Sequence, residues 1–257
     1  MRPIWTGAIG FGLVNIPVKL FSATQGSELD LDMLDKKDLS NIRFIRVNEK
    51  TGKEVPWTNI VKGYMLNNKY VVLDDTDFAS ANAVKTKLIE ISDFVKEAEI
   101  NSIYYETPYY LVPEKSGVRA YALLKQALLK TGKAGVSTFV MRNKEHLAIL
   151  RATEDIMILN QLRFSEEIRD TKDLELAASA VKPGELKMAI SLINQLSGKF
   201  NIASYKDNYT QQLLKLIKAK AKGNKPAATH LKVVHSKAKD LMAQLKASLS
   251  AKTKKAS

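Results

Sequence analysis

The sequence of 257 residues contains no cysteine. This absence excludes disulfide bonds, thiolate zinc sites and cysteine nucleophiles. The only histidines, His146, His230 and His235, are too scattered along the chain to indicate a metal site. We therefore expect neither a cofactor nor a bound metal.

Long apolar runs are also missing. No stretch approaches the roughly 18–20 apolar residues that a membrane-spanning helix needs. The start of the chain, Met1–Trp5, lacks the apolar stretch and cleavage site of a secretory signal. We expect a cytoplasmic protein that makes no contact with a membrane.

Patterns typical of enzymes are weak. The glycine-rich segment Gly7–Gly12 lacks the Gly-Lys-Ser/Thr ending of a phosphate-binding loop, so its glycines are better interpreted as letting a strand bend or two backbones approach closely. A group of acidic residues is interpreted as helix caps or as partners of Arg163 and Arg169. Its members are Glu166, Glu167, Asp170 and Asp173. Because no nucleophile–base arrangement is visible, we expect a binding protein without catalytic activity.

Positive charge is concentrated at the C-terminal end. Residues 1–200 contain 27 basic and 25 acidic residues, whereas residues 201–257 contain 13 basic and 2 acidic ones. A like-charged segment gains little from folding on itself and much from meeting a polyanion. Charge alone leaves open whether this segment binds nucleic acid or only keeps the protein soluble.

The first two thirds of the chain predict mainly short strands. Closely spaced apolar runs with polar turns between them favour a β-barrel or a β-sandwich over a doubly wound sheet. One helix interrupts them, with Ser116 as its expected N-cap and Gly132 at its C-terminal end. The predicted strands lie near Ala8–Ile16, Arg43–Val47, Lys69–Leu73, Lys87–Ile91, Ile103–Val112, Val136–Met141, Leu147–Leu150 and Ile156–Leu162.

After Asp170 the apolar period becomes helical. Pro183 begins a predicted helix that Gly198 stops, and a second helix ends at Gly223. The second helix is expected to carry Tyr205, Tyr209, Leu213, Leu216 and Ile217 on one face and Lys215, Lys218, Lys220 and Lys222 on the other. Beyond a linker at Gly223–Pro226, a third amphipathic helix presents Leu241, Met242, Leu245 and Leu249 as a candidate partner-binding stripe.

A second basic stretch lies among the predicted strands. Spread lysines and arginines on extended backbone suit phosphates, which require positive charge but no sequence-specific geometry. Composition fits a solvated hairpin equally well. The candidate DNA-binding residues of this stretch are Arg43, Arg46, Lys50, Lys53, Lys62 and Lys69.

The order of several motifs resembles the bacterial Ku family of DNA-end-binding proteins. The similarity spans nearly the whole chain. It is carried by Arg2–Gly7, Phe11–Leu20, Glu54–Pro56, Lys62–Tyr64, Tyr109–Pro113, Ala120–Leu124, Leu162–Phe164, Ile168–Arg169, Glu185–Ala189, Tyr205–Tyr209 and Asp240–Leu249.

The resemblance implies a mixed, mainly β fold: a Ku-type β-barrel core with a DNA-encircling strap and a C-terminal α-helical arm. It implies a barrel over 1–170 with the strap near 43–70, a dimerisation arm over 171–223, and a linker, partner-binding helix and basic tail over 224–257. An extended chain rises about 3.3 Å per residue, so Asn48–Lys69 reaches about 70 Å, against about 60 Å around a duplex. Some relatives carry a cysteine pair near Asn48–Lys53, which this chain lacks.

The same resemblance implies a function. A homodimeric ring would bind double-stranded DNA ends without reading sequence during non-homologous end joining, would recruit and stimulate DNA ligase D through Asp240–Leu249, and would associate with the bacterial nucleoid. Two other functions stay open. A general nucleic-acid architectural protein would bind closed circles as well as linear DNA, and a nuclease would need a clustered carboxylate or metal site.

Overall fold

The computed structural model describes residues 1–81, 87–142, 144–175 and 179–223. Contacts divide the chain into two compact units. The first comprises Met1–Gly26 and Leu31–Asp170, and the second comprises Ser27–Asp30 and Thr171–Ser257. The predicted partner-binding residues Leu241, Met242, Leu245 and Leu249 lie outside the described residues.

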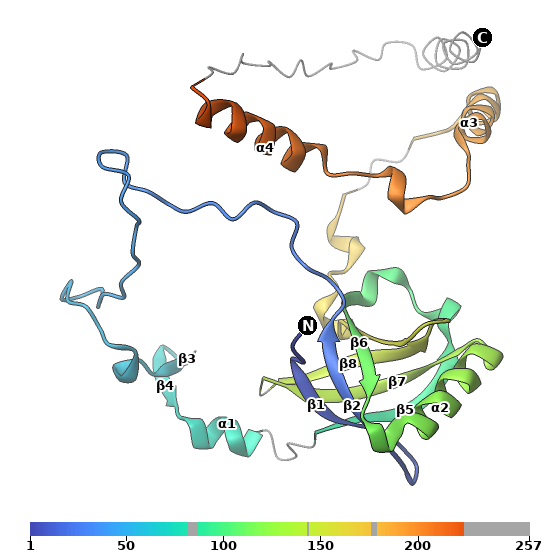
Figure 1. The fold of residues 1–257 in the computed structure, drawn as a ribbon, viewed down its shortest axis with the longest axis horizontal. Coiled ribbons are helices and arrows are strands. Elements are labelled where there is room, and N and C mark those ends of the chain that lie inside the picture. The colour runs from blue at the N-terminus through green and yellow to red at the C-terminus, as the bar shows by residue number, and fades with distance from the viewer. Residues whose placement is uncertain (82–86, 143, 176–178, 224–257) are drawn as a thin grey trace. The chain divides into compact units, whose positions relative to one another are not determined.

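The first unit contains a closed β-barrel with the strand order β1-β2-β6-β9-β8-β7-β5 (Figure 1). Neighbouring strands are antiparallel except β1 and β5, whose parallel pairing closes the barrel. Barrel and sandwich were both open from the sequence, and the barrel is what forms. The strands are β1 (Trp5–Phe11), β2 (Val14–Ser22), β5 (Leu88–Lys96), β6 (Tyr105–Pro113), β7 (Lys133–Met141), β8 (Lys144–Ala152) and β9 (Met157–Leu162).

The N-terminal glycines form a hairpin and a close contact. The run expected as one strand over Ala8–Ile16 is two strands, because Gly12 adopts a positive φ of 55° and turns the chain between β1 and β2. A Cβ atom at Gly7 would lie 2.2 Å from the carbonyl oxygen of Lys87, where no side chain fits. This confirms that the glycines serve backbone geometry.

Helix α2 (Val118–Thr131) packs on the barrel (Figure 1). Its buried residues Tyr121, Leu124 and Leu128 join the barrel core. The helix is capped at its N-terminus by Gly117, without a side-chain hydrogen bond, so the prediction of Ser116 as N-cap was wrong. At the other end Gly132 adopts the left-handed conformation, as predicted.

Between β2 and β5 the structure holds two further strands and a short helix. Strands β3 (Lys62–Leu66) and β4 (Lys69–Leu73) form a separate two-stranded sheet, and helix α1 spans Asp75–Ala81. The strand predicted over Arg43–Val47 does not form; Val47 makes only an isolated bridge to Glu54. Short 3₁₀ helices span Trp57–Asn59, Glu97–Glu99, Ser102–Tyr104, Lys115–Gly117, Ser165–Glu167, Thr171–Asp173 and Ile202–Ser204.

The second unit contains helices α3 (Pro183–Leu196) and α4 (Asn208–Ala221). Pro183 occupies the first turn of α3, as predicted. Asp207 caps α4, and the Thr210 hydroxyl and backbone N–H that donate to its carboxylate lower the pKa of Asp207. Tyr205 does not belong to α4: it follows a 3₁₀ helix and stacks on Phe200, with ring centroids 6.0 Å apart.

The lysines of α4 do not share one face. At about 100° per residue, Lys218 and Lys222 lie on the side of Lys215, but Lys220 lies about 140° away, beside the apolar Leu216. The prediction that placed all four lysines opposite the apolar stripe was therefore wrong for Lys220. All four side chains are exposed.

The acidic group after β9 includes a structural cap. A carboxylate oxygen of Glu167 accepts a hydrogen bond from the backbone N–H of Phe164 at 2.8 Å, and its other oxygen lies 4.0 Å from Nζ of Lys144. Arg163 pairs instead with Glu106, at 3.8 Å. Within the described ranges, no cluster of three or more metal-binding side chains occurs, and no helix is long and apolar enough to cross a membrane.

Candidate nucleic-acid interface

The candidate interface lies on the loop of residues 23–87, whose two ends are fixed on the barrel by one strand. In the register of the sheet, Trp5 of β1 pairs with Leu20 at the end of β2, and Ala8 of β1 pairs with Leu88 at the start of β5. Because β2 and β5 flank β1, the two anchor residues lie about 10 Å apart across the sheet and, three residues apart in register, about 10 Å apart along it. The loop is thus attached at both ends to one rigid body.

Charge is segregated along this loop. Residues 28–38 carry five acidic and two basic residues, whereas residues 43–69 carry six basic residues and only Glu49 and Glu54 as acids. Residues 74–77 are acidic again, with Asp74, Asp75 and Asp77. The central part is therefore a positive segment between two negative ones.

All six predicted basic residues of this segment are exposed: Arg43, Arg46, Lys50, Lys53, Lys62 and Lys69. Within the described part of the chain, none of them forms an ion pair with a carboxylate. Their positive charge is therefore available to an external anion. Lys36 and Lys37 are exposed as well. They were not predicted as DNA-binding residues, because the surrounding acidic residues make the net charge of this segment negative.

A tight turn presents two of these charges. The backbone N–H of Asn48 donates to the carbonyl oxygen of Lys53 at 2.8 Å, and the Asn48 side chain accepts from the N–H groups of Lys50 and Thr51, both at 3.0 Å. Gly52 completes the turn with a φ of 65°. These bonds hold Lys50 and Lys53 on a defined backbone.

Two of the basic side chains lie over aromatic rings. The guanidinium carbon of Arg46 is 4.3 Å from the centroid of the Trp57 ring, and Nζ of Lys62 is 4.7 Å from the centroid of Phe78. The attraction between a cation and the face of an aromatic ring restricts where each charge points. Sequence reasoning missed both partners, because spacing does not reveal which ring meets which cation.

The two-stranded sheet carries Lys62 and Lys69 on a hairpin. Lys62 begins β3, and Lys69 begins β4 directly after the turn. Asn67 and Asn68 both have positive φ, which is the geometry of the two-residue turns that join antiparallel strands. Helix α1 follows, and Asp74 caps it by accepting from the hydroxyl and N–H of Thr76. These hydrogen bonds lower the pKa of Asp74 below its ordinary value, the hydroxyl of Thr76 contributing most.

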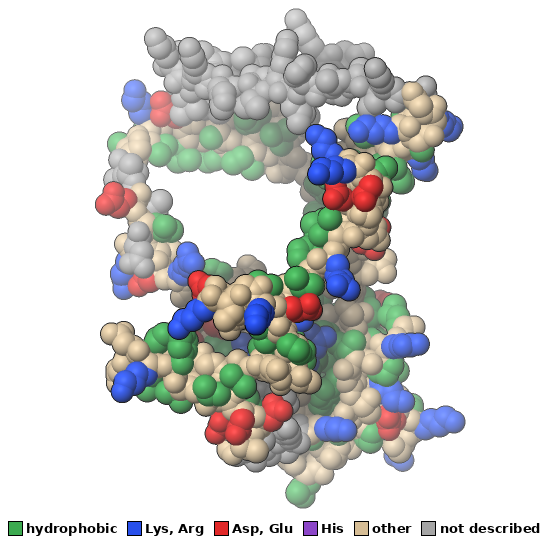
Figure 2. Space-filling model, turned by 90° about the vertical axis from the view of Figure 1, so that its left-hand side faces the viewer, with side chains coloured by type: hydrophobic (Ala, Val, Ile, Leu, Met, Phe, Trp, Pro, Cys, Tyr) green, Lys and Arg blue, Asp and Glu red, His purple; other side chains and the backbone are tan. Residues whose placement is uncertain are grey.

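Large apolar side chains accompany the charges on this loop. They are exposed, and Figure 2 shows a face on which hydrophobic side chains lie next to lysine and arginine. Nearly every residue of the hairpin is exposed on both of its faces. The exposed set includes Phe44, Ile45, Trp57, Tyr64, Met65, Leu66, Tyr70, Val71 and Val72.

Comparison with known proteins identifies the family. The model of the Ku70/Ku80 β-barrel domain matches residues 10–188. The protein called "Non-homologous end joining protein Ku" from Opitutus terrae is 41% identical over 223 residues, which cover 86% of this chain and 80% of that protein. Proteins of the same name from Coxiella burnetii and Archaeoglobus fulgidus are 36% and 39% identical, over 98% of this chain in both cases and 96% and 99% of their own lengths. The chain belongs to the Ku family.

Proposed function

We propose that this protein binds the ends of double-stranded DNA in non-homologous end joining. The observation that carries the proposal is the loop of residues 23–87, anchored at both ends on the barrel, with a central segment of exposed basic residues that form no ion pair in the described structure. The names of the relatives support the pathway.

The chemistry of the loop fits backbone recognition. Lysine and arginine side chains on turns and an exposed hairpin meet phosphates, whereas base reading needs side chains inserted into a groove with fixed geometry. A protein that holds any broken end must bind without regard to sequence. We therefore assign phosphate contacts to Arg43, Arg46, Lys50, Lys53, Lys62 and Lys69, and further contacts to Lys215, Lys218, Lys220 and Lys222 of the helical arm.

A homodimer accounts for the exposed apolar surface. An isolated two-stranded hairpin is at best marginally stable in water, and β3–β4 carries Tyr64, Leu66 and Val72 exposed. Helix α3 exposes Ile190 and Ile193 on one face. A second copy covers such surfaces and closes two loops into a ring around the duplex. The ring loads only where the duplex stops, so end preference needs no chemical recognition of the end.

Recruitment belongs to the C-terminal segment. We propose, from the family resemblance, that residues 224–257 bind DNA ligase D through Leu241, Met242, Leu245 and Leu249, which lie outside the described residues. The protein then acts as a scaffold and the ligase performs the chemistry. The arm of residues 171–223 serves dimerisation in this assignment.

The decisive experiment compares one duplex in three forms. Linear DNA with free ends should bind, whereas the same linear DNA with streptavidin on both biotinylated ends and a closed circle should not. Equal binding to all three forms would instead identify a general architectural protein. Cleavage of any form after addition of Mg²⁺ would identify a nuclease and overturn the assignment of a non-catalytic role.

A further inference from the structure

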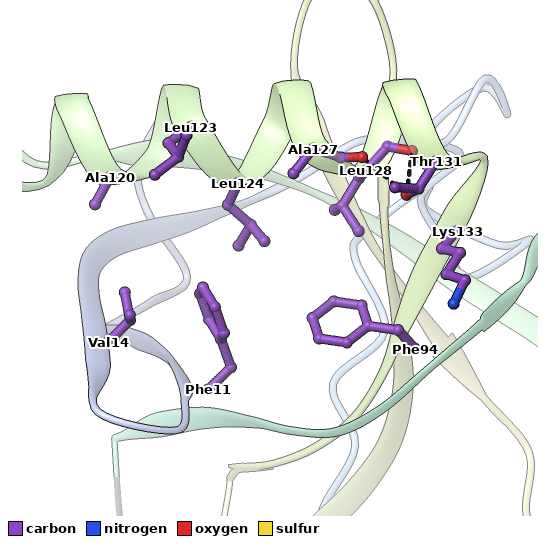
Figure 3. Close-up of a pocket in the computed structure, with 10 residues that line it drawn as sticks. All are labelled: Phe11, Val14, Phe94, Ala120, Leu123, Leu124, Ala127, Leu128, Thr131 and Lys133. Carbon is purple, nitrogen blue, oxygen red and sulfur yellow. Dashed lines mark hydrogen bonds between the residues drawn. The ribbon is translucent and has the colours of Figure 1, made fainter.

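An apolar groove runs along helix α2 on the barrel (Figure 3). It has a volume of about 430 Å³. One wall is α2, which contributes residues at helical spacing from Ala120 to Thr131, and the other wall consists of Phe11, Val14 and Phe94. None of these residues belongs to the candidate DNA interface. We call this surface the α2 groove.

The α2 groove is part of the packed structure of the barrel. Phe11 and Phe94 meet edge to face, with ring centroids 6.2 Å apart, and Leu124 and Leu128 are buried beneath the helix. The side chain of Ala127 is too small to fill the space opposite these rings. The result is a concave apolar surface between α2 and the two rings.

The rim of the groove is apolar and solvent-exposed. Leu123 is 72% exposed and Phe94 is 40% exposed, although both line the groove. A single exposed leucine is ordinary, but contiguous apolar side chains around a concave surface mark a binding site.

The geometry favours an α-helix as the occupant. The barrel is closed, so it offers no strand edge to which an extended peptide could add. The stripe from Ala120 to Thr131 is about 16 Å long, or about three helical turns. A short amphipathic helix can lie along it with apolar side chains entering between Leu123 and Phe94.

Two lysines determine the charge of the occupant. Lys133 lines one end of the groove, and it is the register partner of Lys96 in the antiparallel pair of β5 and β7. Lys96 lies two residues after Phe94 and therefore on the same face of β5. Like charges directly opposite each other destabilise a sheet, and neither lysine has a carboxylate partner within the residues described. Acidic side chains between them remove this repulsion.

The rest of α2 has the same sign of charge. Over Val118–Thr131 it carries Arg119, Lys125 and Lys130 and no acidic residue. The chain's own basic C-terminal region, residues 201–257 with 13 basic and 2 acidic residues, is therefore a poor occupant. We propose that the α2 groove binds an acidic amphipathic helix of a partner protein, with aliphatic side chains against Leu123 and Phe94 and carboxylates at Lys96 and Lys133.

A peptide selection on the full-length protein tests this proposal for a partner of any identity. The probe is a phage-displayed library of helical peptides of about 16 residues, which span slightly more than the groove. Selected peptides should carry large apolar residues at i, i+3 or i+4, and i+7, with Asp or Glu beside them. Their synthetic forms should bind with micromolar Kd in fluorescence anisotropy.

Three variants locate the binding. Leu123→Asp should weaken the selected peptides by about tenfold or more, because it places a charge on the apolar rim. Lys96→Glu with Lys133→Glu should reverse the preference, so that peptides with Lys in place of Glu bind better. The control Lys37→Glu, exposed and remote in sequence from α2, β5 and β7, should leave the Kd within about twofold.

Each contrary outcome overturns the proposal. The proposal is wrong if the selection enriches no peptide, or if Leu123→Asp leaves the Kd of the selected peptides unchanged. It is also wrong if the selected peptides carry no acidic residues. A loss of the dimer in sedimentation of Leu123→Asp would show that a second copy occupies the groove instead. Binding of DNA ends by this variant should be unchanged, so failure of the groove and failure of the proposed DNA function can be told apart.

Discussion

The guanidinium of Arg46 lies over Trp57, with its carbon 4.3 Å from the centroid of the ring. The Trp57 side chain is 69% exposed, so burial in a core does not explain why a tryptophan occurs at this position. A backbone hydrogen bond also connects the two segments: the N–H of Val55, two residues before Trp57, donates to the carbonyl oxygen of Arg46 at 2.8 Å. The Trp57 ring therefore restricts the position of the Arg46 guanidinium, which we propose contacts a DNA phosphate.

Removing this ring should weaken DNA binding without removing any charge. Trp57→Ala should lower the affinity for a linear duplex about two- to fivefold per subunit, since an exposed cation–π contact contributes about 0.5–1 kcal/mol. Trp57→Phe keeps a ring face and should retain most of the affinity. Phe44→Ala removes an exposed aromatic that has no cation over it in the described structure, and should have no effect in the same gel-shift series.

Neutralising the basic segment should change the salt dependence of binding. Contacts to about 6–10 phosphates make affinity fall roughly 10³–10⁵-fold between about 50 and 200 mM salt. Replacing Arg43, Arg46, Lys53 and Lys62 by glutamine should weaken every duplex alike and reduce the slope of log K against log salt by about 0.9 per lost contact. Lys130→Gln on α2 should leave the slope unchanged. An unaltered slope in the quadruple variant would mean that these residues form only a solvated surface.

The apolar face of α3 should be a dimer contact. Ile193 is 62% exposed, so Ile193→Asp should leave the subunit folded and shift it to a monomer in sedimentation at micromolar concentration. A stable homodimer of this kind should bury more than about 2,000 Å². Ser191→Asp, on the opposite side of the helix, should stay dimeric. A wild-type protein that is a folded monomer at this concentration would contradict the proposed dimeric ring around DNA.

The C-terminal segment should separate binding from recruitment. Truncation after Asn224 should keep the dimer and much of its duplex binding, somewhat weakened by loss of the tail lysines, but abolish stimulation of end joining by the cognate ligase. The double change of Leu241 and Leu245 to Asp should do the same without removing a positive residue. Wild-type stimulation by the double variant in a ligation assay would show that the recruiting residues lie elsewhere.

Tyr121 should make the barrel sensitive to alkaline pH. Its hydroxyl donates to the carbonyl oxygen of Leu111 at 2.7 Å and accepts from the N–H of Met157 at 2.8 Å, which ties α2 to β6 and β9. Burial raises the pKa of Tyr121 above its ordinary value. The folded state therefore holds the phenol proton more tightly than the unfolded state, so stability is complete below about pH 10 and falls as pH rises further.

The variant Tyr121→Phe tests both parts of that statement. It leaves one buried N–H and one buried carbonyl without their partner, which should cost about 1–3 kcal/mol in the free energy of unfolding by urea. It should also reduce the loss of stability above about pH 10, although Tyr105 and Tyr109, whose pKa values burial also raises, keep part of it.

The barrel strands could be predicted because burial leaves an alternating pattern in the sequence. Phe139 and Leu159 lie in runs where every second residue enters the core. The choice between barrel and sandwich could not be predicted, because closure of the barrel depends on the pairing of Ala8 with Leu88, a contact between strands far apart in the sequence. No periodicity reports such a pair.

The loop of residues 23–87 was harder to predict because its apolar residues are not buried in a core. Ile45 and Val47 look like part of a buried strand, but both are more than half exposed, so the apolar run does not reflect a core of this subunit. The basic residues could be found by composition alone. Their organisation could not, because it rests on the Asn48 turn and on rings such as Trp57 that sequence spacing does not connect to a cation.

The pairing of β1 with both β2 and β5 has a consequence for how this family can vary. Because Leu20 and Leu88 pair with Trp5 and Ala8, three residues apart on one strand, the two attachment points do not depend on what lies between them. Doubling the length of such a flexible loop costs only about 0.6 kcal/mol in closure entropy. Changes in the length or sequence of residues 23–87 are therefore compatible with an unchanged barrel, so the reach of the loop can vary separately from the stability of the domain that carries it.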